Sequence, residues 1–166
     1  FRPPLAGLAS MIAAFFVATA CCKATEPTIR VATYNTSLFR DSSGRLIHDL
    51  ETGTNEQARK IAEVIQRVRP DILLVNEFDY DADGRAAELF REKYLAVGQN
   101  GLEPIRYLDQ YIGPVNTGKP SGMDLNNNGR TDDPQDAFGY GYHEGQYGML
   151  VLSRFPVAKE FVRTFQ

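Results

Sequence analysis

The chain has 166 residues, and its content of 43% hydrophobic and 23% charged residues is that of an ordinary globular protein and not of a disordered one. The formal net charge of -3 excludes an overall positive field that would attract nucleic acid. A nucleic-acid substrate would therefore need a local basic patch or a metal ion, and the sequence shows no obvious basic patch.

Residues 1–26 are expected to be a targeting segment that is not part of the fold. The apolar stretch LAGLASMIAAFFVATACC dominates it, and Ala18 and Ala20 match the small-residue pattern of a secretory cleavage site. We therefore expect an exported protein, either extracellular or periplasmic. The alternative is a membrane anchor, although Leu5 to Cys22 is barely long enough to span a bilayer.

Both cysteines, Cys21 and Cys22, lie at the end of this segment. The letters ATAC loosely resemble a bacterial lipoprotein cleavage box, so a lipoprotein signal with lipid attached to Cys21 is a second expectation. The sequence after Lys23 contains no cysteine, which excludes a disulfide framework or a cysteine-ligated zinc site in the body of the protein.

A strand, a helix and a second strand are expected next, and together they form a crossover. TIRVATYN, from Thr28 to Asn35, alternates and is β-branched, which indicates a strand. After a loop, a helix is expected to begin with Thr54 as N-cap and Gln57 as its capping-box partner, and to end before Pro70. The apolar run from Ile72 to Val75 indicates a strand that is buried on both faces and parallel to the first.

The rest of the chain is expected to be less regular. A second helix is predicted over Arg85 to Tyr94, with Asp83 available as its cap. Residues 98–145 are polar and rich in Gly, Asn, Asp and Pro, and only IRYLDQYIGPV within them resembles a strand. Loops this long in a compact domain are usually functional or ordered by an ion. YGMLVLS and VAKEFVRTF are predicted to form two strands around the turn RFP.

Asn35 and Glu77 carry the candidate chemistry, because each ends a predicted strand. Parallel neighbouring strands would bring the two side chains together at one edge of the sheet. A carboxylate held by a rigid strand suits a hard divalent cation such as Mg²⁺, and a nearby amide can hydrogen-bond a phosphate oxygen or an attacking water. The alternative is that both are polar loop-edge residues that meet solvent.

The segments RVATYN, RPDILLVNEFD and GMLVLSRFPV, in this order, resemble the first half of the endonuclease/exonuclease/phosphatase superfamily, which has the deoxyribonuclease-I-like fold. Asn35 matches an asparagine that ends an early strand of the family, Glu77 matches the glutamate that binds the catalytic metal, and Gly148 to Pro156 match a later strand. TNEQARKIAEVIQRVRPDILLVNEFDYD and GYHEGQYGMLVLSRFP look most like the secreted bacterial branch. The resemblance implies an α/β (α+β) fold, a two-layer β-sandwich flanked by helices.

The resemblance also implies a function, namely divalent-metal-dependent hydrolysis of a phosphoester by a nuclease or phosphodiesterase. Mg²⁺ or Mn²⁺ would be held partly by Glu77, water would be the nucleophile, and Asn35 would orient phosphate or water. The partner would be a phosphoester substrate, with nucleic acid among the candidates, and we expect a monomer. The family's second half, with an Asp-x-Asn pair and a late Asp-His pair, is not matched, so residues 27–166 are expected to be the N-terminal half and inactive alone.

DLNNNGRTDD is a second candidate metal site. Positions 1, 3, 5 and 9 of an EF-hand-like calcium loop are occupied by Asp124, Asn126, Asn128 and Asp132. Position 12 is Gln135 instead of glutamate, although Asp136 follows. We expect structural Ca²⁺ here, with an ion-free turn as the alternative. The alternative function of the whole is a non-catalytic, calcium-stabilised extracellular binding module on the same fold.

Several further residues are weaker candidates. DYDADG has a similar spacing but lacks later ligands, so it is interpreted as a helix cap and solvated turn, in which Asp79 could support the metal-binding carboxylate. His143 could contact phosphate, with a surface histidine as the alternative. Tyr140, Tyr142 and Tyr147 could stack on a base or sugar, or cover the edge of a sheet. A lipid phosphodiesterase is a third candidate, which the polar segment 98–145 does not favour.

Overall fold

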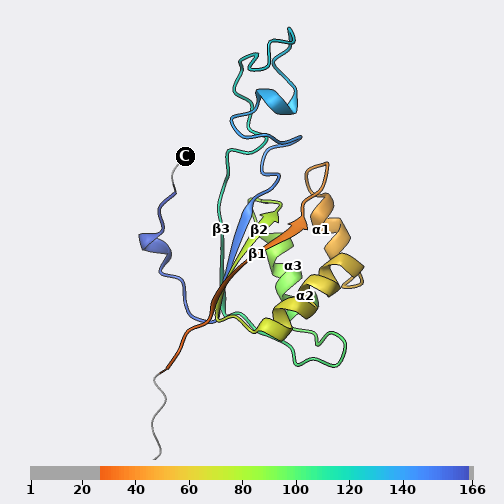
Figure 1. Ribbon diagram of the computed structural model, residues 1–166, viewed down its shortest axis with the longest axis vertical. Coiled ribbons are helices and arrows are strands. Elements are labelled where there is room, and N and C mark those ends of the chain that lie inside the picture. The colour runs from red at the N-terminus through yellow and green to blue at the C-terminus, as the bar shows by residue number, and fades with distance from the viewer. Residues whose placement is uncertain (1–26, 165–166) are drawn as a thin grey trace, which may run out of the picture.

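The computed structural model describes residues 27–164, which form a four-stranded sheet with helices packed on one face (Figure 1). The strands lie in the order β1-β2-β4-β3. Their bounds are Val31–Leu38 for β1, Ile72–Phe78 for β2, Asp109–Ile112 for β3 and Met149–Ser153 for β4. β1 and β2 are parallel, and β4 runs antiparallel to β2 and to β3. The α/β fold is thus confirmed, as an open sheet. The expected targeting segment, residues 1–26 with Cys21, lies outside the described residues.

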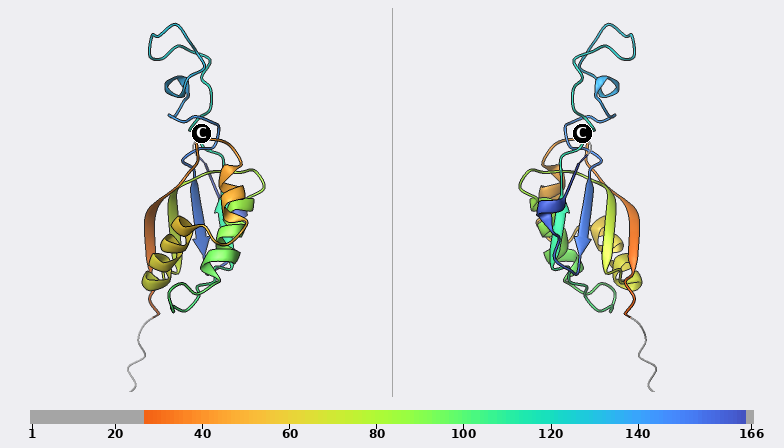
Figure 2. Two further views of the ribbon diagram at one scale, coloured as in Figure 1. Left: turned by 90° about the vertical axis from the view of Figure 1, so that its right-hand side faces the viewer. Right: turned by 90° about the vertical axis from the view of Figure 1, so that its left-hand side faces the viewer.

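The helix α2, Glu56–Val68, connects β1 to β2 and makes the expected crossover. Its apolar stripe is buried against the sheet, and β2 contributes Leu73 and Val75 to the same core. Leu74, on the other face of β2, lines a cavity instead, so β2 is not buried on both faces within the described part of the chain. Figure 2 shows both faces, with the helices in front in the left view and the sheet in front in the right view.

The N-terminus of α2 differs from the prediction by one residue. Asn55, and not Thr54, is the N-cap, and its side chain accepts a hydrogen bond of 3.0 Å from the Ala58 amide. Gln57 does not close a capping box, because its amide donates to the Ser37 carbonyl at 2.8 Å. Asparagine is at least as good an N-cap as threonine. The Gln57 side chain instead satisfies a backbone carbonyl near the end of β1.

The helix α3, Arg85–Phe90, continues into the π-helix η1, Arg91–Leu95, close to the predicted bounds. The aspartate that satisfies its first amides is Asp81 and not Asp83: its carboxylate accepts from Arg85 at 2.7 Å and from the next amide at 3.1 Å. Within residues 27–164, no helix has the length and apolar character needed to cross a membrane.

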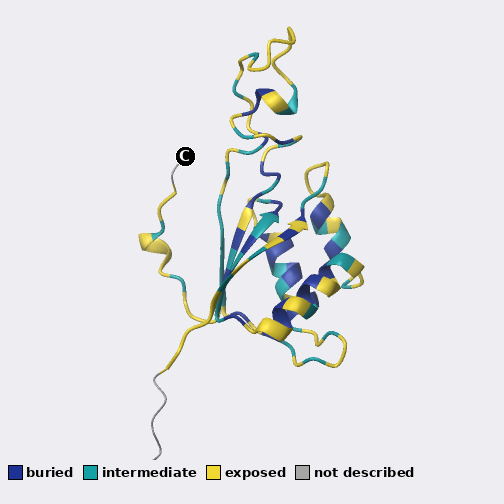
Figure 3. Ribbon diagram, in the orientation of Figure 1, coloured by how far each residue is buried: buried dark blue, intermediate teal, exposed yellow. Residues whose placement is uncertain are grey.

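A short helix that the sequence analysis does not predict, α1, spans Arg45–Leu50. Its start at Gly44 has no side-chain cap, which is why the usual start signal is missing. Leu46 and Leu50 lie one turn apart and are both buried in the core. Figure 3 shows that the buried positions of the helices face the sheet.

The predicted strand after β4 is wrong. The chain turns away from the sheet after Pro156, and Lys159–Phe161 form the 3-10 helix η3. Asp109 holds this segment, since its carboxylate accepts from the Val157 amide at 2.9 Å and pairs with Lys159 at 3.2 Å. The alternating pattern alone is not enough for a strand, because a strand also needs a neighbour with free hydrogen-bonding groups.

The part of the polar segment after β3, residues 113–145, forms a lobe that projects beyond the sheet (Figure 1, cyan at the top). Two isolated bridges tie its base together, Thr117 with Gly139 and Pro120 with Ala137. The 3-10 helix η2, Pro134–Asp136, lies between this base and the tip of the lobe (Figure 1). Most of the lobe is exposed, so its order depends on local hydrogen bonds rather than on a core (Figure 3).

Candidate active site

The ends of β1 and β2 meet at a β-bulge. Asn35 pairs with Asn76 and Leu38 pairs with Phe78, so two residues of β1 lie opposite Glu77 alone. A bulge changes the direction of side chains at the end of a strand, and bulges are frequent next to active sites. The predicted closeness of Asn35 and Glu77 therefore has a structural basis in the register of these two strands.

The backbone of this bulge is in the left-handed region at two residues that are not glycine. Ser37 has a φ of 50° and Glu77 a φ of 54°. Strict alternation along β2 would place Glu77 on the core side with Leu73 and Val75. The left-handed conformation turns it toward the opposite face, where it lines the same cavity as Asn35. The local strain thus determines where the carboxylate points.

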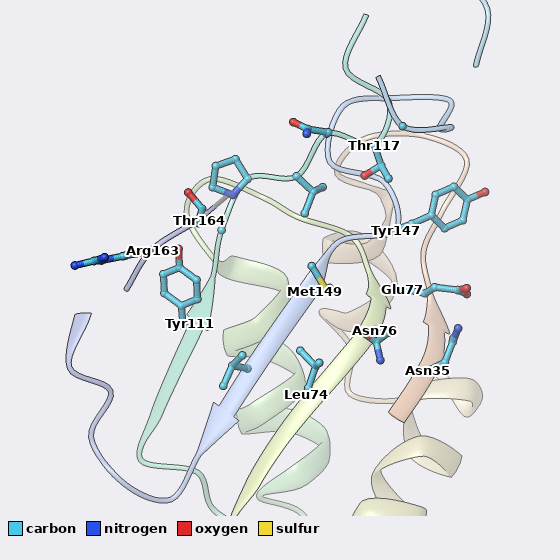
Figure 4. A pocket seen from close by; sticks show the side chains of 16 residues that line it. Asn35, Leu74, Asn76, Glu77, Tyr111, Thr117, Tyr147, Met149, Arg163 and Thr164 are labelled. Carbon is cyan, nitrogen blue, oxygen red and sulfur yellow. The ribbon is translucent and has the colours of Figure 1, made fainter. Parts of the chain in front are cut away.

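Ser37 connects the two predicted residues. Its hydroxyl donates to Glu77 Oε2 at 3.2 Å, and its backbone amide donates to Asn35 Oδ1 at 3.2 Å. Figure 4 shows Asn35 and Glu77 next to each other at one side of the cavity. Ser37 is a functional residue that the sequence pattern does not predict; its one signal is a small hydroxyl residue two positions after Asn35.

The cavity is open and has a volume of about 700 Å³. Its floor is the uncovered face of the sheet, with Leu74 from β2 and Met149 and Val151 from β4. The remaining lining residues are Asn35, Asn76, Glu77, Tyr111, Gly113, Pro114, Val115, Asn116, Thr117, Gly139, Tyr147, Arg163 and Thr164. The cavity therefore combines an apolar floor with polar groups at the rim, which is typical of ligand sites.

Asp79 supports the loops around this rim and is not itself a lining residue. Its carboxylate accepts from the Arg40 amide at 2.7 Å and from the Tyr147 amide at 3.3 Å. Burial raises the pKa of the Asp79 carboxyl above its ordinary value of 3.8, and the hydrogen bond from Arg40, the charge of His143 and the hydrogen bond from Tyr147 oppose this rise. Asp79 thus holds the backbone just after β1 and just before β4, the two strands that flank β2 and Glu77.

The structure does not bring His143 into the cavity. Its Nε2 lies 3.0 Å from the Arg40 carbonyl oxygen and 4.0 Å from Asp79 Oδ2, and its side chain is mostly buried. Gln146 donates to the same Arg40 carbonyl at 2.7 Å. In this position His143 holds the Arg40 loop, and a contact with phosphate remains a prediction.

The tyrosines lie beside the cavity. Tyr147 lines it, and the ring of Tyr147 packs against Phe39 with centroids 4.5 Å apart. Tyr140 stacks on Tyr147 at 6.5 Å with an interplanar angle of 30°, and Tyr140 and Tyr142 are exposed. The expectation that these rings stack on a base or sugar remains a prediction, and their position is compatible with it.

The residues at the cavity fit a divalent cation held by one carboxylate. Among the described residues Glu77 forms no ion pair, and it receives a hydrogen bond from Ser37 on one oxygen. No group of three or more His, Cys, Asp or Glu side chains within residues 27–164 is arranged to hold a metal. Mg²⁺ often uses one or two carboxylates and completes its shell with water and substrate phosphate, so the donor set is sufficient for part of such a shell.

The predicted calcium ligands lie in the projecting lobe, beyond the end of β2, the strand that contains Glu77 (Figure 1). Asp124 accepts from the Asn128 and Gly129 amides at 3.1 and 2.8 Å. Asn126 and Asn128 donate to Asp133. Asp132 points outward and pairs with Arg130 at 3.0 Å, with its side chain 74% exposed. The loop thus gathers Asp124, Asn126 and Asn128, and Asp132 is set apart.

Comparisons with known proteins identify one matching family and one similar solved structure. Residues 32–166 match the family model described as Endonuclease/Exonuclease/phosphatase family. Among solved structures, the endonuclease/exonuclease/phosphatase from Beutenbergia cavernae DSM 12333 is similar at 20% identity with a TM-score of 0.35. This match covers 77% of the present chain and 26% of that chain, so the present chain spans about a quarter of that protein. No curated protein matches.

Proposed function

The chain belongs to the endonuclease/exonuclease/phosphatase family, whose members are generally metal-dependent phosphoester hydrolases, and on this premise we propose that the protein hydrolyses a phosphoester with the help of a divalent cation. The observation that carries the proposal is the hydrogen-bonded set of Asn35, Ser37 and Glu77 at the rim of the cavity. It places a carboxylate and an amide together where a substrate can reach them.

Glu77 is the proposed ligand of the cation, Mg²⁺ or Mn²⁺. When bound, such a cation neutralises charge on phosphoryl oxygens and on the leaving oxygen. Ser37 holds one carboxylate oxygen of Glu77, and the left-handed backbone fixes the direction of the side chain. The carboxylate is therefore positioned before substrate arrives, which reduces reorganisation during the reaction.

Asn35 is the proposed contact to phosphate or to the attacking water. Its Oδ1 is occupied by the Ser37 amide, and its Nδ2 donates no hydrogen bond within residues 27–164. An amide nitrogen can donate to a phosphate oxygen or to a water, and the bond from Ser37 fixes which end of the amide faces the cavity. Asn35 would thus orient the reacting groups next to the cation.

The proposed substrate class is a phosphodiester, with nucleic acid among the candidates. The cavity rim is not basic: Arg163 is its one cationic side chain among the described residues. Phosphate binding would therefore depend on the cation more than on arginine or lysine. The tyrosines beside Glu77 offer rings that tolerate any base, which is compatible with a nuclease.

Hydrolysis of a bis-aryl phosphodiester by the full-length protein tests the proposal. The expected result is Mg²⁺-dependent hydrolysis that is lost in Glu77→Gln and kept in Glu92→Gln, a matched change at an exposed glutamate. Equal rates for the protein and Glu77→Gln would contradict the assignment. Absence of hydrolysis by the full-length protein itself would favour the alternative, a non-catalytic calcium-stabilised binding module.

A further inference from the structure

Asp136 has a carboxylate oxygen that nothing in the described structure satisfies. The residue is 1% exposed, and its Oδ1 accepts from the Leu125 amide at 2.8 Å. Its Oδ2 is buried and has no hydrogen-bond partner within residues 27–164. Buried carboxylates are normally paired, hydrogen-bonded or bound to a metal, because an unpaired one is costly. A hydrogen-bond donor or a cation is therefore expected beside the second oxygen of Asp136.

That oxygen lies beside the start of the predicted calcium loop. Leu125, which holds the first oxygen of Asp136, directly follows Asp124. Asp136 thus stands one residue after position 12 of the loop, where an EF-hand has its bidentate glutamate and where this chain has Gln135. We propose that this loop binds Ca²⁺ and that Asp136 is the carboxylate ligand from its far end, together with Asp124, Asn126 and Asn128.

The chemistry of the loop favours Ca²⁺. Its side-chain donors are oxygen atoms of carboxylates and amides, and Ca²⁺ takes six to eight such oxygens in flexible geometry, whereas Mg²⁺ demands near-ideal octahedral geometry. The side-chain amides of Asn126 and Asn128 donate to Asp133, while their oxygens accept from the backbone amides of Asn128 and Arg130. Each amide oxygen has a second lone pair that can face a cation. Backbone carbonyls and water would complete the shell.

The charge around the loop also favours a cation. Residues 124–136 carry the four carboxylates of Asp124, Asp132, Asp133 and Asp136 and a single cationic side chain, that of Arg130. These carboxylates therefore create a negative field across the loop. Arg130 is exposed and pairs with Asp132 and not with Asp136, so it does not occupy the position assigned to Ca²⁺.

Calcium at this position would join the two ends of the projecting lobe. Asp124 lies before the turn, whereas Asp136 belongs to η2 after it. Two residues beyond Asp136, Phe138 donates its amide to the Lys119 carbonyl at 2.9 Å, and the Thr117–Gly139 bridge follows. Thr117 and Gly139 line the cavity, so the ion would stabilise one wall of it.

Calorimetric titration with CaCl₂ tests the proposal, with full-length Glu77→Gln as the parent so that a cation in the cavity does not contribute. We expect one site with a dissociation constant of about 10⁻⁴–10⁻³ M, the range of extracellular calcium modules. Asp136→Asn should weaken it by about tenfold or more, because a carboxylate ligand is lost. Asp83→Asn, in the similar sequence DYDADG, is the matched control and should leave the affinity unchanged.

Limited proteolysis locates the ion. Arg130 is exposed inside the loop, and Ca²⁺ should slow tryptic cleavage after it in the parent but not in Asp136→Asn. If Asp136→Asn does not fold in chelator, as judged by circular dichroism, Asp124→Asn takes its place with the same expected loss. Absence of calcium binding in the parent, or equal affinity in the parent and the ligand variant, would overturn the proposal.

Discussion

Ser37 donates its hydroxyl to Glu77 across a β-bulge, at 3.2 Å, and both residues have left-handed backbones. Each non-glycine residue in this conformation costs about 1–3 kcal/mol. The sheet pairing of Asn35 with Asn76 before the bulge and of Leu38 with Phe78 after it holds the strained residues in place. The strain is retained where a carboxylate must leave the core side of a strand and face the cavity.

Removal of the Ser37 hydroxyl should weaken metal binding and leave the protein folded. We expect Ser37→Ala to raise the Mg²⁺ concentration for half-maximal hydrolysis by about tenfold, as for other residues that orient a metal ligand. The free energy of unfolding should fall by only about 0.5–1.5 kcal/mol. Excess Mg²⁺ should restore the rate in Ser37→Ala but not in Glu77→Gln. Ser43→Ala, at an exposed serine, is the control.

Two substitutions at Glu77 separate its side chain from its backbone. Glu77→Gly and Glu77→Ala both remove the carboxylate, so both should be inactive. Glycine tolerates the left-handed region and alanine does not, so Glu77→Gly should be more stable by about 0.5–1 kcal/mol after its larger unfolded-state entropy is counted. Urea unfolding measures the difference. A Glu77→Ala protein at least as stable as Glu77→Gly would show that the backbone at this position is not strained.

The N-cap of α2 gives a test that is independent of function. Asn55→Ala removes the acceptor of the Ala58 amide and should cost about 1 kcal/mol of stability. Thr54→Ala should cost less, because Thr54 does not cap the helix and its hydroxyl bonds Thr52 at 2.7 Å. Denaturant titrations of both variants provide the comparison. A larger loss of unfolding free energy for Thr54→Ala than for Asn55→Ala would indicate that Thr54 is the N-cap, as the sequence predicts.

The buried carboxyl of Asp79 makes stability depend on pH. Because its pKa is raised in the folded state, folding favours the protonated form, and Asp79 contributes most to stability below its ordinary pKa of 3.8. As pH rises from there through the raised pKa, this contribution is lost. With rising pH, the unfolding free energy of the unsubstituted protein should therefore fall relative to that of Asp79→Asn. A shift in its favour would show that the hydrogen bonds from Arg40 and Tyr147 outweigh burial.

The sequence predicts the elements whose signals are long and regular. The stripe of α2 and the apolar run of β2 appear with nearly the expected bounds, because burial of a continuous apolar face determines them. The six-residue helix α1 has no capping side chain, so its start carries no local signal. The strand predicted after β4 fails because pairing depends on a neighbour that the local pattern does not contain.

The candidate site is predictable in its residues but not in its geometry. Asn35 and Glu77 follow from the parallel crossover, which brings two strand ends together. The bulge is not predictable, because a left-handed backbone is usually indicated by glycine and neither Ser37 nor Glu77 is a glycine. The sequence places Asp136 next to position 12 of the loop, but only the fold shows that one of its oxygens is buried without a hydrogen-bond partner among residues 27–164.

A crystal structure of the full-length protein with Mn²⁺, using the anomalous signal of the metal, tests the central assignment most directly. We predict an anomalous peak within about 2.0–2.3 Å of a Glu77 carboxylate oxygen, close to the distance of hard divalent cations from their oxygen ligands. The peak should be absent in Glu77→Gln crystals soaked in the same way. A Glu77 carboxylate with no metal beside it, or engaged by an arginine or lysine, would contradict the assignment.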